Sequence, residues 1–380
     1  MKVRQFLSIL VLGVCASIVV APSAPWAAQA FTAQDLNIED AIKGVGPNVS
    51  GQAAVRSGFV SAQSSRKTPG EIAENISVEV QAEGMGPALL PGSDQFTVNG
   101  INDAGDVVGS ANVRFGSRQC RPNIPEAPPS GTCPMSAVHA VIWTKLGGLR
   151  DLGTLPGDTS SEAYAINNSG AVVGYSSGPQ GTRAFLWTPK AGFQNLGTLP
   201  AGDSSKALGL NDNGMIVGSA SSPAGTHAVL WDPAKGIRDL DTLPGDFISE
   251  AFAINISGSV VGHSKGPAGT RAFIWTSQTG MKSLPSLPGG NVTRALGINK
   301  KGEAVGSSGS FDGARAVFWN SKGEAQDLNA VVSTPAGLTL LEAVGINESG
   351  QIVALEGDES NMHGFHEGSN RVLLLTPIVP

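Results

Sequence analysis

Residues 162–174 read Glu-Ala-Tyr-Ala-Ile-Asn-Asn-Ser-Gly-Ala-Val-Val-Gly, and this stretch decides the fold. It opens with small side chains at Ala163 and Ala165 and large ones at Tyr164 and Ile166. Side chains alternate between the two faces of a strand, so we expect a small face and a large face. A helical period does not give this alternation. The pattern predicts sheets that stack face to face, with large side chains beside small ones.

The stretch belongs to a repeat with a step of 44 residues. The asparagine that follows the alternating residues recurs at Asn167, Asn211, Asn255 and Asn299. Five tryptophans keep the same step, at Trp143, Trp187, Trp231, Trp275 and Trp319. A Leu-Pro pair keeps it too, starting at Leu155, Leu199, Leu243 and Leu287. A fixed period of this size indicates a repeat architecture.

Each repeat has room for four short strands. The polar turn after the asparagine ends in glycine, as at Gly170, which is a hairpin signal. Arg183 to Trp187 is the candidate third strand, and a fourth runs from Phe193 to Leu199. Four short strands in one repeat match a blade of a β-propeller. We therefore predict an all-β, β-propeller-like fold of four-stranded blades, with an open solenoid of the same units as the alternative.

Further copies extend the repeat in both directions. Upstream, Asn102 begins one, and downstream Asn347 begins another that lacks its tryptophan; terminal repeats are often atypical. This gives six units of about 44 residues, or seven if a faint copy at residues 47–52 contributes. We assign residues 86–380 to the propeller domain and residues 31–85 to an N-terminal segment that holds the degenerate copy. Residues 371–376 are a further strand candidate, which completes the last blade or closes the ring against the first.

The first unit differs from the others by an insertion. Asn102 and Trp143 are 41 residues apart, where the other units have 20, so this unit carries 21 extra residues. Cys120 and Cys133 both fall in it, and in an exported protein such a pair predicts a disulfide in a loop at residues 118–136. Closing a loop of this size stabilises by roughly 3 kcal/mol in the chain-entropy view. A metal site is the alternative for these cysteines.

The N-terminus predicts export. Residues 1–30 combine Lys2 and Arg4, an apolar run and the small-x-small sequence Ala28-Gln29-Ala30, which is typical of a cleaved signal peptide. An uncleaved membrane anchor is the alternative, although the apolar run is short for a span. Cleavage removes two of 25 basic residues and none of the 31 acidic ones, which leaves a net charge of −8. This charge, without a basic cluster interleaved with aromatics, argues against nucleic acid as a partner. No later run predicts an integral membrane domain.

Several phrases recur in register and resemble a known family. The Asn-x-x-Gly-x-Val-Val-Gly turn, the His/Arg-Ala-Phe/Val-x-Trp strand and the Asp-Leu-Gly-Thr-Leu-Pro-Gly strand resemble the HAF repeats of bacterial extracellular proteins. Residues 139–141, 227–229 and 271–273 carry the signature that names these repeats. The resemblance covers about residues 86–367. It implies an extracellular or periplasmic location and a repeat architecture, and it supplies no catalytic residues.

One slot of the third strand holds either histidine or arginine. We call its occupants the rim donors: His139, Arg183, His227, Arg271, Arg315 and His363. A slot that accepts both types asks for a donor or a positive charge rather than a metal ligand. The simpler interpretation is a structural bond to a neighbouring turn. The sharper one is a ring of donors suited to an anionic or sugar ligand. We predict no metal site and no cofactor.

Two motifs suggest chemistry that the repeat explains better. Gly174-Tyr175-Ser176-Ser177-Gly178 matches the hydrolase elbow, but a Gly/Pro loop follows where the elbow needs a helix. Residues 211–214 resemble part of a calcium loop, yet the later copies lose the oxygens, so a turn explains them better.

A charge alternation marks the residue before each first-strand alanine. These residues are Glu162, Lys206, Glu250, Arg294 and Glu342, and they predict ion pairs between adjacent blades.

These features predict an exported, non-catalytic binding or interaction scaffold. The loops that depart from the repeat, chiefly the cysteine loop, are the expected contact surface, because loops on a rigid frame carry specificity. The partner is a glycan, a peptide or another envelope protein. The alternative is a glycan-cleaving hydrolase or lyase with its site at the channel mouth, where Glu162, Glu250 and Glu342 supply paired carboxylates.

Overall fold

The computed structural model describes residues 30–35, 41–45, 54–57, 96–119, 132–310, 313–332, 339–357 and 371–378. Within these ranges the chain is nearly all strand, with one short 3-10 helix at Leu328–Ala330. The predicted signal peptide lies outside them except for Ala30, as do Cys120, His363 and the side chain of Cys133, so the disulfide stays a prediction. No helix among these residues is long and apolar enough to span a membrane.

The repeats from residue 96 to residue 327 each form one antiparallel sheet of four strands. The first sheet contains β4 (Phe96–Ile101), β5 (Val107–Gln119), β6 (Thr132–Thr144) and β7 (Gly148–Gly153). The second contains β8 (Ser160–Ile166), β9 (Val172–Gly178), β10 (Gly181–Thr188) and β11 (Gly192–Asn195). The third contains β12 (Ser205–Leu210), β13 (Ile216–Ser222), β14 (Gly225–Asp232) and β15 (Gly236–Asp239).

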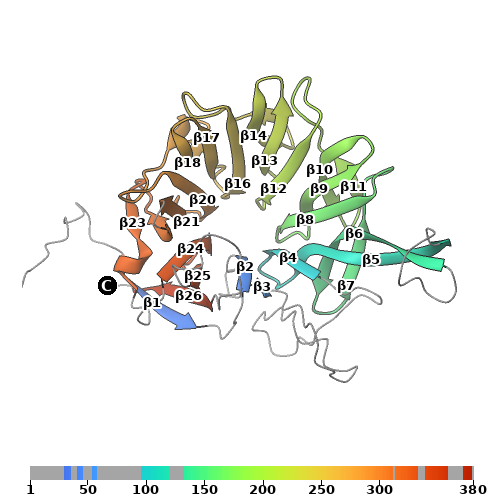
Figure 1. Ribbon diagram of the computed structural model, residues 1–380, viewed down its shortest axis with the longest axis horizontal. Helices are drawn as coiled ribbons and strands as arrows, with labels where there is room; N and C mark the ends of the chain where they lie inside the picture. Colours follow the sequence, from blue (N-terminus) through green and yellow to red (C-terminus); the bar gives the residue numbers. More distant parts are fainter. Residues whose placement is uncertain are drawn as a thin grey trace, which may run out of the picture.

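The next two sheets repeat this order. The fourth contains β16 (Ile248–Ile254), β17 (Val260–Gly266), β18 (Gly269–Thr276) and β19 (Gly280–Ser283). The fifth contains β20 (Val292–Ile298), β21 (Ala304–Ser310), β22 (Gly313–Trp319) and β23 (Ala325–Asp327). A single parallel bridge from Thr270 to Val292 links these two sheets. The first strand of each sheet lies innermost around a common axis (Figure 1), so the fold is the predicted β-propeller.

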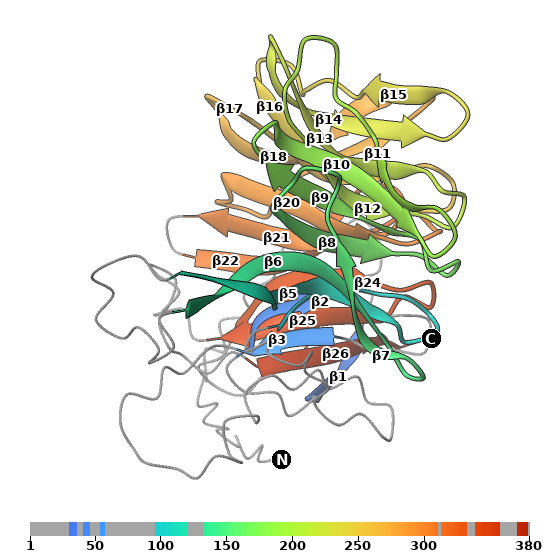
Figure 2. The ribbon, with the colours of Figure 1, turned by 90° about the vertical axis from the view of Figure 1, so that its right-hand side faces the viewer.

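The sixth sheet joins the two ends of the described chain. It contains β24 (Thr339–Ile346), β25 (Ile352–Gly357) and β26 (Arg371–Pro377), and its outer strand is β1 (Phe31–Asp35) from the N-terminal segment. β1 pairs antiparallel with β26 from Phe31 opposite Pro377 to Asp35 opposite Leu373 (Figure 2). The predicted strand at residues 371–376 therefore completes the last blade. The sixth blade thus includes a strand from residues 31–85, which we assigned to a separate segment.

A two-stranded hairpin occupies the interval between the sixth and first sheets. It consists of β2 (Ala41–Val45) and β3 (Ala54–Ser57), and it contacts β24 and β25 on one side and β4 on the other (Figure 1). These strands flank the faint seventh copy at residues 47–52. Among the described residues the ring thus consists of six four-stranded blades and one hairpin in a seventh position.

A β-bulge changes the alternation predicted for the first strands. In β8 the register shifts between Ala163 and Ala165, so Tyr164 is the extra residue. Ala163 and Ile166 consequently face the same way, in a core shared with the first sheet, whereas Ala165 packs against the core shared with the third. The expectation that Ala163 and Ala165 share one face is therefore wrong. The bulge recurs at the equivalent place in all six first strands.

Small residues at this place bring first strands of adjacent sheets close together. A Cβ atom built on Gly209 would lie 2.6 Å from the Phe252 carbonyl oxygen of the next sheet. Within the second sheet, a Cβ on Gly174 would lie 1.9 Å from the carbonyl oxygen of Glu162. Such distances exclude larger side chains, so the small residues are needed for close approach.

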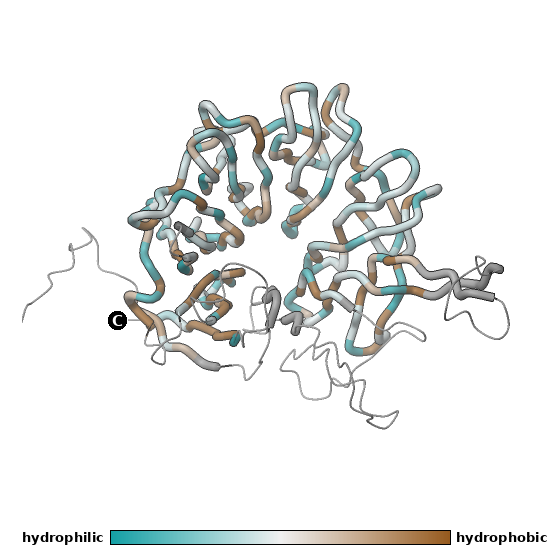
Figure 3. Tube along the Cα trace, viewed as in Figure 1, coloured by the Kyte–Doolittle hydropathy of each residue, from teal (hydrophilic) through white to brown (hydrophobic). Residues whose placement is uncertain are grey.

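The hydrophobic cores lie between sheets rather than within them. One core joins Val108 and Ile142 of the first sheet to Phe185 and Trp187 of the second, and equivalent cores follow around the ring. Four of the repeat tryptophans are buried, with Trp319 0% exposed, so they anchor blades as the repeat predicts. In the sixth sheet, β26 brings the hydrophobic run at residues 372–375 (Figure 3), and these four residues are buried.

The fourth strands are shorter than the sequence suggests. The strand predicted from Phe193 to Leu199 ends at Asn195, and Gly197 then takes a left-handed backbone with φ of 76°. Leu199 still reaches the core between the second and third sheets. The chain therefore leaves the sheet early and uses Leu199 to anchor the loop that leads to the next blade.

The repeated asparagines tie each sheet to the next. The Oδ1 atom of Asn255 accepts hydrogen bonds from the backbone amides of Ser257 and Ser259, which fixes its own turn. Its Nδ2 atom donates to the carbonyl oxygen of Asn299 in the following sheet at 2.9 Å. The same inter-sheet bond is made by Asn102, Asn167, Asn211 and Asn299. This confirms the turn interpretation of residues 211–214, since Asn211 Oδ1 serves the amides of its own turn.

Candidate functional site

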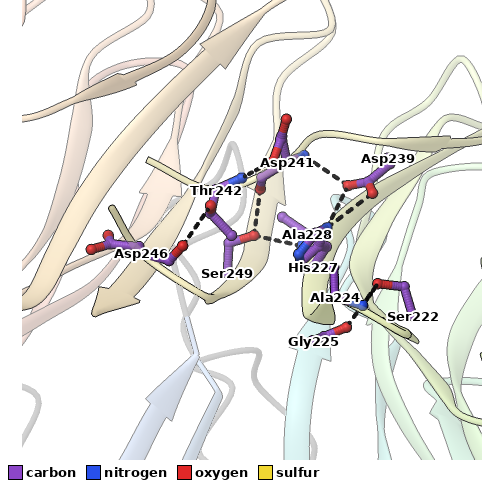
Figure 4. Close-up of polar contacts among 10 residues, drawn as sticks. All are labelled: Ser222, Ala224, Gly225, His227, Ala228, Asp239, Asp241, Thr242, Asp246 and Ser249. Atoms are coloured by element: carbon purple, nitrogen blue, oxygen red, sulfur yellow. Dashed lines mark hydrogen bonds and ion pairs between the residues drawn. The ribbon is translucent and has the colours of Figure 1, made fainter. Parts of the chain in front are cut away.

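The five described rim donors each hold a carboxylate. His139 Nδ1 lies 3.0 Å from Asp151 and His227 Nδ1 lies 2.9 Å from Asp239, both on the fourth strand or its end. Figure 4 shows His227 with Asp239, beside Ser249, which links the third and fourth sheets by accepting from Ala228 N at 2.8 Å. Arg315 pairs with Asp327 at 2.9 Å in the same way.

In the other two sheets the carboxylate comes from a different place. Arg183 pairs with Asp158, and Arg271 pairs with Asp246 at 2.9 Å. Both aspartates follow the Leu-Pro turn, and they take this role because Asn195 and Ser283 stand where the other sheets have a fourth-strand aspartate. The donors are thus committed to internal bonds. The structural interpretation fits them, and they do not form a free ring for an anionic ligand; His363 lies outside the described residues.

The pKa of Asp151 reflects its pairing. Burial alone would raise the pKa of this carboxyl group, but hydrogen bonds from His139 and from the Gly153 amide, with the charge of His139, lower it below the ordinary value. Asp151 therefore stays ionised beside His139.

The alternating charges on the first strands do not pair with each other. No ion pair joins Glu162, Lys206, Glu250 or Arg294 to a neighbour among the described residues, so the inter-blade prediction is wrong for these four. Neutral donors from the preceding sheet replace the expected cations. Ser219 Oγ donates to Glu250 at 3.5 Å, and Asn99 Nδ2 donates to Glu162 at 3.1 Å.

A pocket of about 930 Å³ opens between the first and second sheets. One wall is β6, where the long β5–β6 hairpin leaves the first sheet, and the other is β8 with the end of the Leu-Pro turn. The lining consists of Ala137, Val138, His139, Thr154, Asp158, Thr159, Ser160, Ser161, Glu162 and Tyr175. The pocket therefore lies at the base of the hairpin whose tip carries the cysteine loop, which is where the repeat is interrupted.

Of the two carboxylates that line this pocket, Glu162 has no ion pair. Tyr175 OH donates to Glu162 Oε2 at 2.7 Å, and Asn99 Nδ2 donates to Oε1. Burial, the hydrogen bond to Glu162 and the charge of Glu162 raise the pKa of Tyr175, so its phenol keeps the proton. Burial and Glu162 also raise the pKa of Tyr164 to about 12. Neutral groups thus surround the carboxylate, and no ion pair compensates its negative charge.

Three hydroxyl groups of the lining already donate their protons. Thr154 Oγ1 donates to the Asp158 carbonyl, Thr159 Oγ1 to the Ser177 carbonyl, and Ser161 Oγ to the Gly153 carbonyl. Thr154 and Thr159 therefore offer lone pairs rather than protons to a ligand, whereas Ser161 is buried and already accepts from the Ala140 amide.

Asp158 also belongs to the pocket wall, but its carboxylate is buried. Its side chain is 1% exposed and its Oδ1 atom binds Arg183, while Oδ2 is buried and has no hydrogen-bond partner. The equivalent Asp246 differs, because Ser264 Oγ donates to its Oδ2 at 2.7 Å. At the pocket, Ser176 Oγ instead donates to the Ser160 carbonyl. Ser176 is 0% exposed and also accepts from the Leu155 amide, which excludes the exposed nucleophile of a hydrolase elbow.

The sequence singled out Glu162 but not its partner. Tyr175 occupies a second-strand position that is serine in the third and fifth repeats and histidine in the fourth. That irregularity was the available signal, and the cross-strand pairing of Glu162 with Tyr175 makes it meaningful. The described part of the chain contains no group of three or more potential metal ligands.

Comparison with models of known protein families gives no match, and comparison with curated proteins gives none either. Among solved structures, dipeptidyl peptidase 4 from Porphyromonas gingivalis is 12% identical with a TM-score of 0.39, and the match covers 67% of this chain and 40% of that one. TolB from Acinetobacter baumannii is 12% identical with a TM-score of 0.38, over 70% and 64% of the two chains. Virginiamycin B lyase from Staphylococcus aureus is 11% identical with a TM-score of 0.40, over 74% and 95%. The chain spans less than two thirds of the first two proteins, and these likenesses concern the fold alone.

Proposed function

We propose that this chain is an exported, non-catalytic binding scaffold that takes its ligand in the pocket between the first and second blades. The observation that carries the proposal is the position of this pocket. It lies at the base of the β5–β6 hairpin, the main interruption of a ring whose other sheets repeat the same bonds. The resemblance to HAF repeats and the leader-like residues 1–30 support an extracellular or periplasmic location. The ligand is a glycan, a peptide or an envelope protein.

The enzyme alternative needs two available carboxylates on opposite sides of a bond to be cleaved. Two carboxylates line the pocket, but Asp158 is held by Arg183 and its side chain is 1% exposed. Glu162 is left without a second available carboxylate among the lining residues. This arrangement supports binding rather than hydrolysis.

Glycan and peptide arrays test the proposal with the purified mature chain. We expect retention of at least one ligand class without turnover, as followed by mass spectrometry of the eluted ligand. Cleavage of a bound glycan would favour the hydrolase or lyase alternative. If no glycan or peptide on the arrays binds at any concentration, the proposal that this pocket binds a ligand is contradicted. Glu250→Gln is the matched control for Glu162→Gln, because Glu250 holds the same strand position two blades on and lies outside the pocket lining.

A further inference from the structure

We infer that the pocket between the first and second blades recognises its ligand through a protonated primary amine. This inference rests on the proposed binding function and assigns the chemistry of its ligand. It reverses the expectation of an anionic ligand drawn from the rim donors.

The first step is the balance of donors and acceptors in the pocket. The hydroxyl protons of Thr154, Thr159 and Ser161 go to backbone carbonyls, and the Tyr175 proton goes to Glu162. Ser161 is buried and already accepts from the Ala140 amide, so the open acceptors beside Glu162 are Thr154 and Thr159. A ligand that offers only acceptors would leave them unpaired, which is costly in a desolvated site.

The second step is charge. The Glu162 carboxylate has only neutral hydrogen-bond partners, which are Asn99, Tyr175 and Tyr164, and no ion pair. A carboxylate has about four lone-pair positions, so a position remains for a ligand. Lys206 forms no ion pair with Glu162; its Nζ atom lies over the Tyr175 ring, 4.9 Å from the centroid. A ligand cation completes the charge pair that the protein itself leaves open.

The third step is the size of the cation. A compact ammonium group carries three N–H donors, and it suits a site with more than one acceptor, here Glu162 with the hydroxyl oxygens of Thr154 and Thr159. Asp158 is not one of these acceptors, because Arg183 holds it and its side chain is 1% exposed.

The amine can belong to an amino sugar or to the N-terminus of a peptide, and paired probes separate these sources. We would titrate the full mature chain with glucosamine and N-acetylglucosamine, and with a short peptide before and after N-acetylation, by isothermal calorimetry at neutral pH. We expect one free amine to bind and its acetylated form to bind at least about tenfold more weakly, because the charge-assisted hydrogen bond is lost. The arm that binds identifies the source.

Three variants connect the affinity to the pocket. Glu162→Gln keeps the shape and is expected to weaken amine binding by about ten- to a hundredfold. Glu250→Gln should leave it unchanged. Tyr175→Phe removes a neutral donor but keeps the charge of Glu162, so binding should persist within a few fold. If Glu162→Gln folds poorly, Tyr175→Phe still shows whether a pocket that keeps Glu162 binds the amine.

Binding of the acetylated probes as tightly as the free amines would overturn the inference while leaving the binding scaffold intact, and so would an unchanged affinity in Glu162→Gln. Failure of every amine probe would overturn it too. An array without any hit, by contrast, counts against the proposed function itself.

Discussion

The side-chain amide of Asn255 donates a hydrogen bond of 2.9 Å to the carbonyl oxygen of Asn299, which begins the equivalent turn of the next blade. Both residues are buried. Since four other asparagines make the same contact, the ring is held by a ladder of side chains as well as by apolar cores. Each of these bonds is a second hydrogen bond to a buried carbonyl that already accepts from a glycine amide of its own turn, as Asn299 does from Gly302, and the set is testable by substitution.

Replacing Asn255 by aspartate removes only the donor half of one rung. Asn255→Asp keeps an oxygen for the Ser257 and Ser259 amides but loses Nδ2, so the Asn299 carbonyl faces a carboxylate. We expect the free energy of unfolding to fall by about 1–3 kcal/mol in chemical denaturation. Asn213→Asp is the control, because the exposed Asn213 also donates across blades, to the Ile256 carbonyl. A control as damaging as Asn255→Asp would contradict the ladder account.

Two tryptophans at the same repeat position differ in one hydrogen bond. Trp319 Nε1 donates to the Pro285 carbonyl at 2.8 Å, whereas the buried Trp231 Nε1 has no partner. Trp319→Phe should therefore lower the free energy of unfolding by about 1 kcal/mol more than Trp231→Phe, since only the former strands a carbonyl. Equal losses in denaturant titrations of the two variants would show that packing alone sets the role of these residues.

His263 gives the fold a pH dependence. Burial, with the charges of Arg294 and Lys265, lowers the pKa of His263 from 6.5 to about 4 in the folded chain, although Glu250 lies opposite on β16. As the pH falls below 6.5, His263 takes up a proton in the unfolded chain but not in the folded chain. The contribution of neutral His263 to the free energy of unfolding is therefore complete above pH 6.5 and is lost as the pH falls toward 4. The loss amounts to roughly 3 kcal/mol.

Serine stands at the equivalent position in the adjacent blades, as Ser219 and Ser307, so we choose the substitution His263→Ser to test this dependence. Unfolding free energies measured from pH 7 to pH 4 should fall less steeply in His263→Ser than in the parent chain. Parallel pH profiles for the two proteins would mean that His263 titrates in the folded state as it does in a free chain.

Phe31 tests the closure of the ring. This residue begins β1, is 6% exposed and packs edge-on against Phe318 with ring centroids 5.9 Å apart. Phe31→Ala should cost about 3–5 kcal/mol, the usual range for a buried phenylalanine. Thr32→Ala, at an exposed neighbouring position in the same strand, should cost less than about 1 kcal/mol. Similar melting temperatures for the two variants would indicate that β1 does not contribute to the sixth blade.

The period of the sequence predicted the blades because four landmarks in each repeat keep one step. Tyr164 shows where that reasoning fails. A bulge adds a residue without changing the local composition, so alternation alone placed Ala163 and Ala165 on one face although they face different neighbours. The closing strand β1 was missed for a similar reason, since its partner β26 lies at the other end of the chain and its five residues carry no repeat landmark.

The candidate site was predicted only in part. The rim donors were recognised from their shared slot. Their partners alternate between an aspartate at the fourth strand, such as Asp151, and an aspartate after the Leu-Pro turn, such as Asp158, and the sequence alone does not show that these aspartates lie close to the donors. Glu162 was singled out by its place in a charge alternation, and the sequence suggested a cationic partner. The structure supplies Tyr175 and Asn99 instead, because the preceding sheet and the second strand approach the first strand more closely than the next blade's charge does.

Hydrogen–deuterium exchange with the tightest array ligand tests the central claim, that binding occurs between the first and second blades, most directly. We predict slower exchange on ligand addition for amides at residues 137–139 and 158–162, and no change at residues 225–227 and 246–250, which occupy the same places two blades on. Protection confined to other blades or to the asparagine turns would contradict the account.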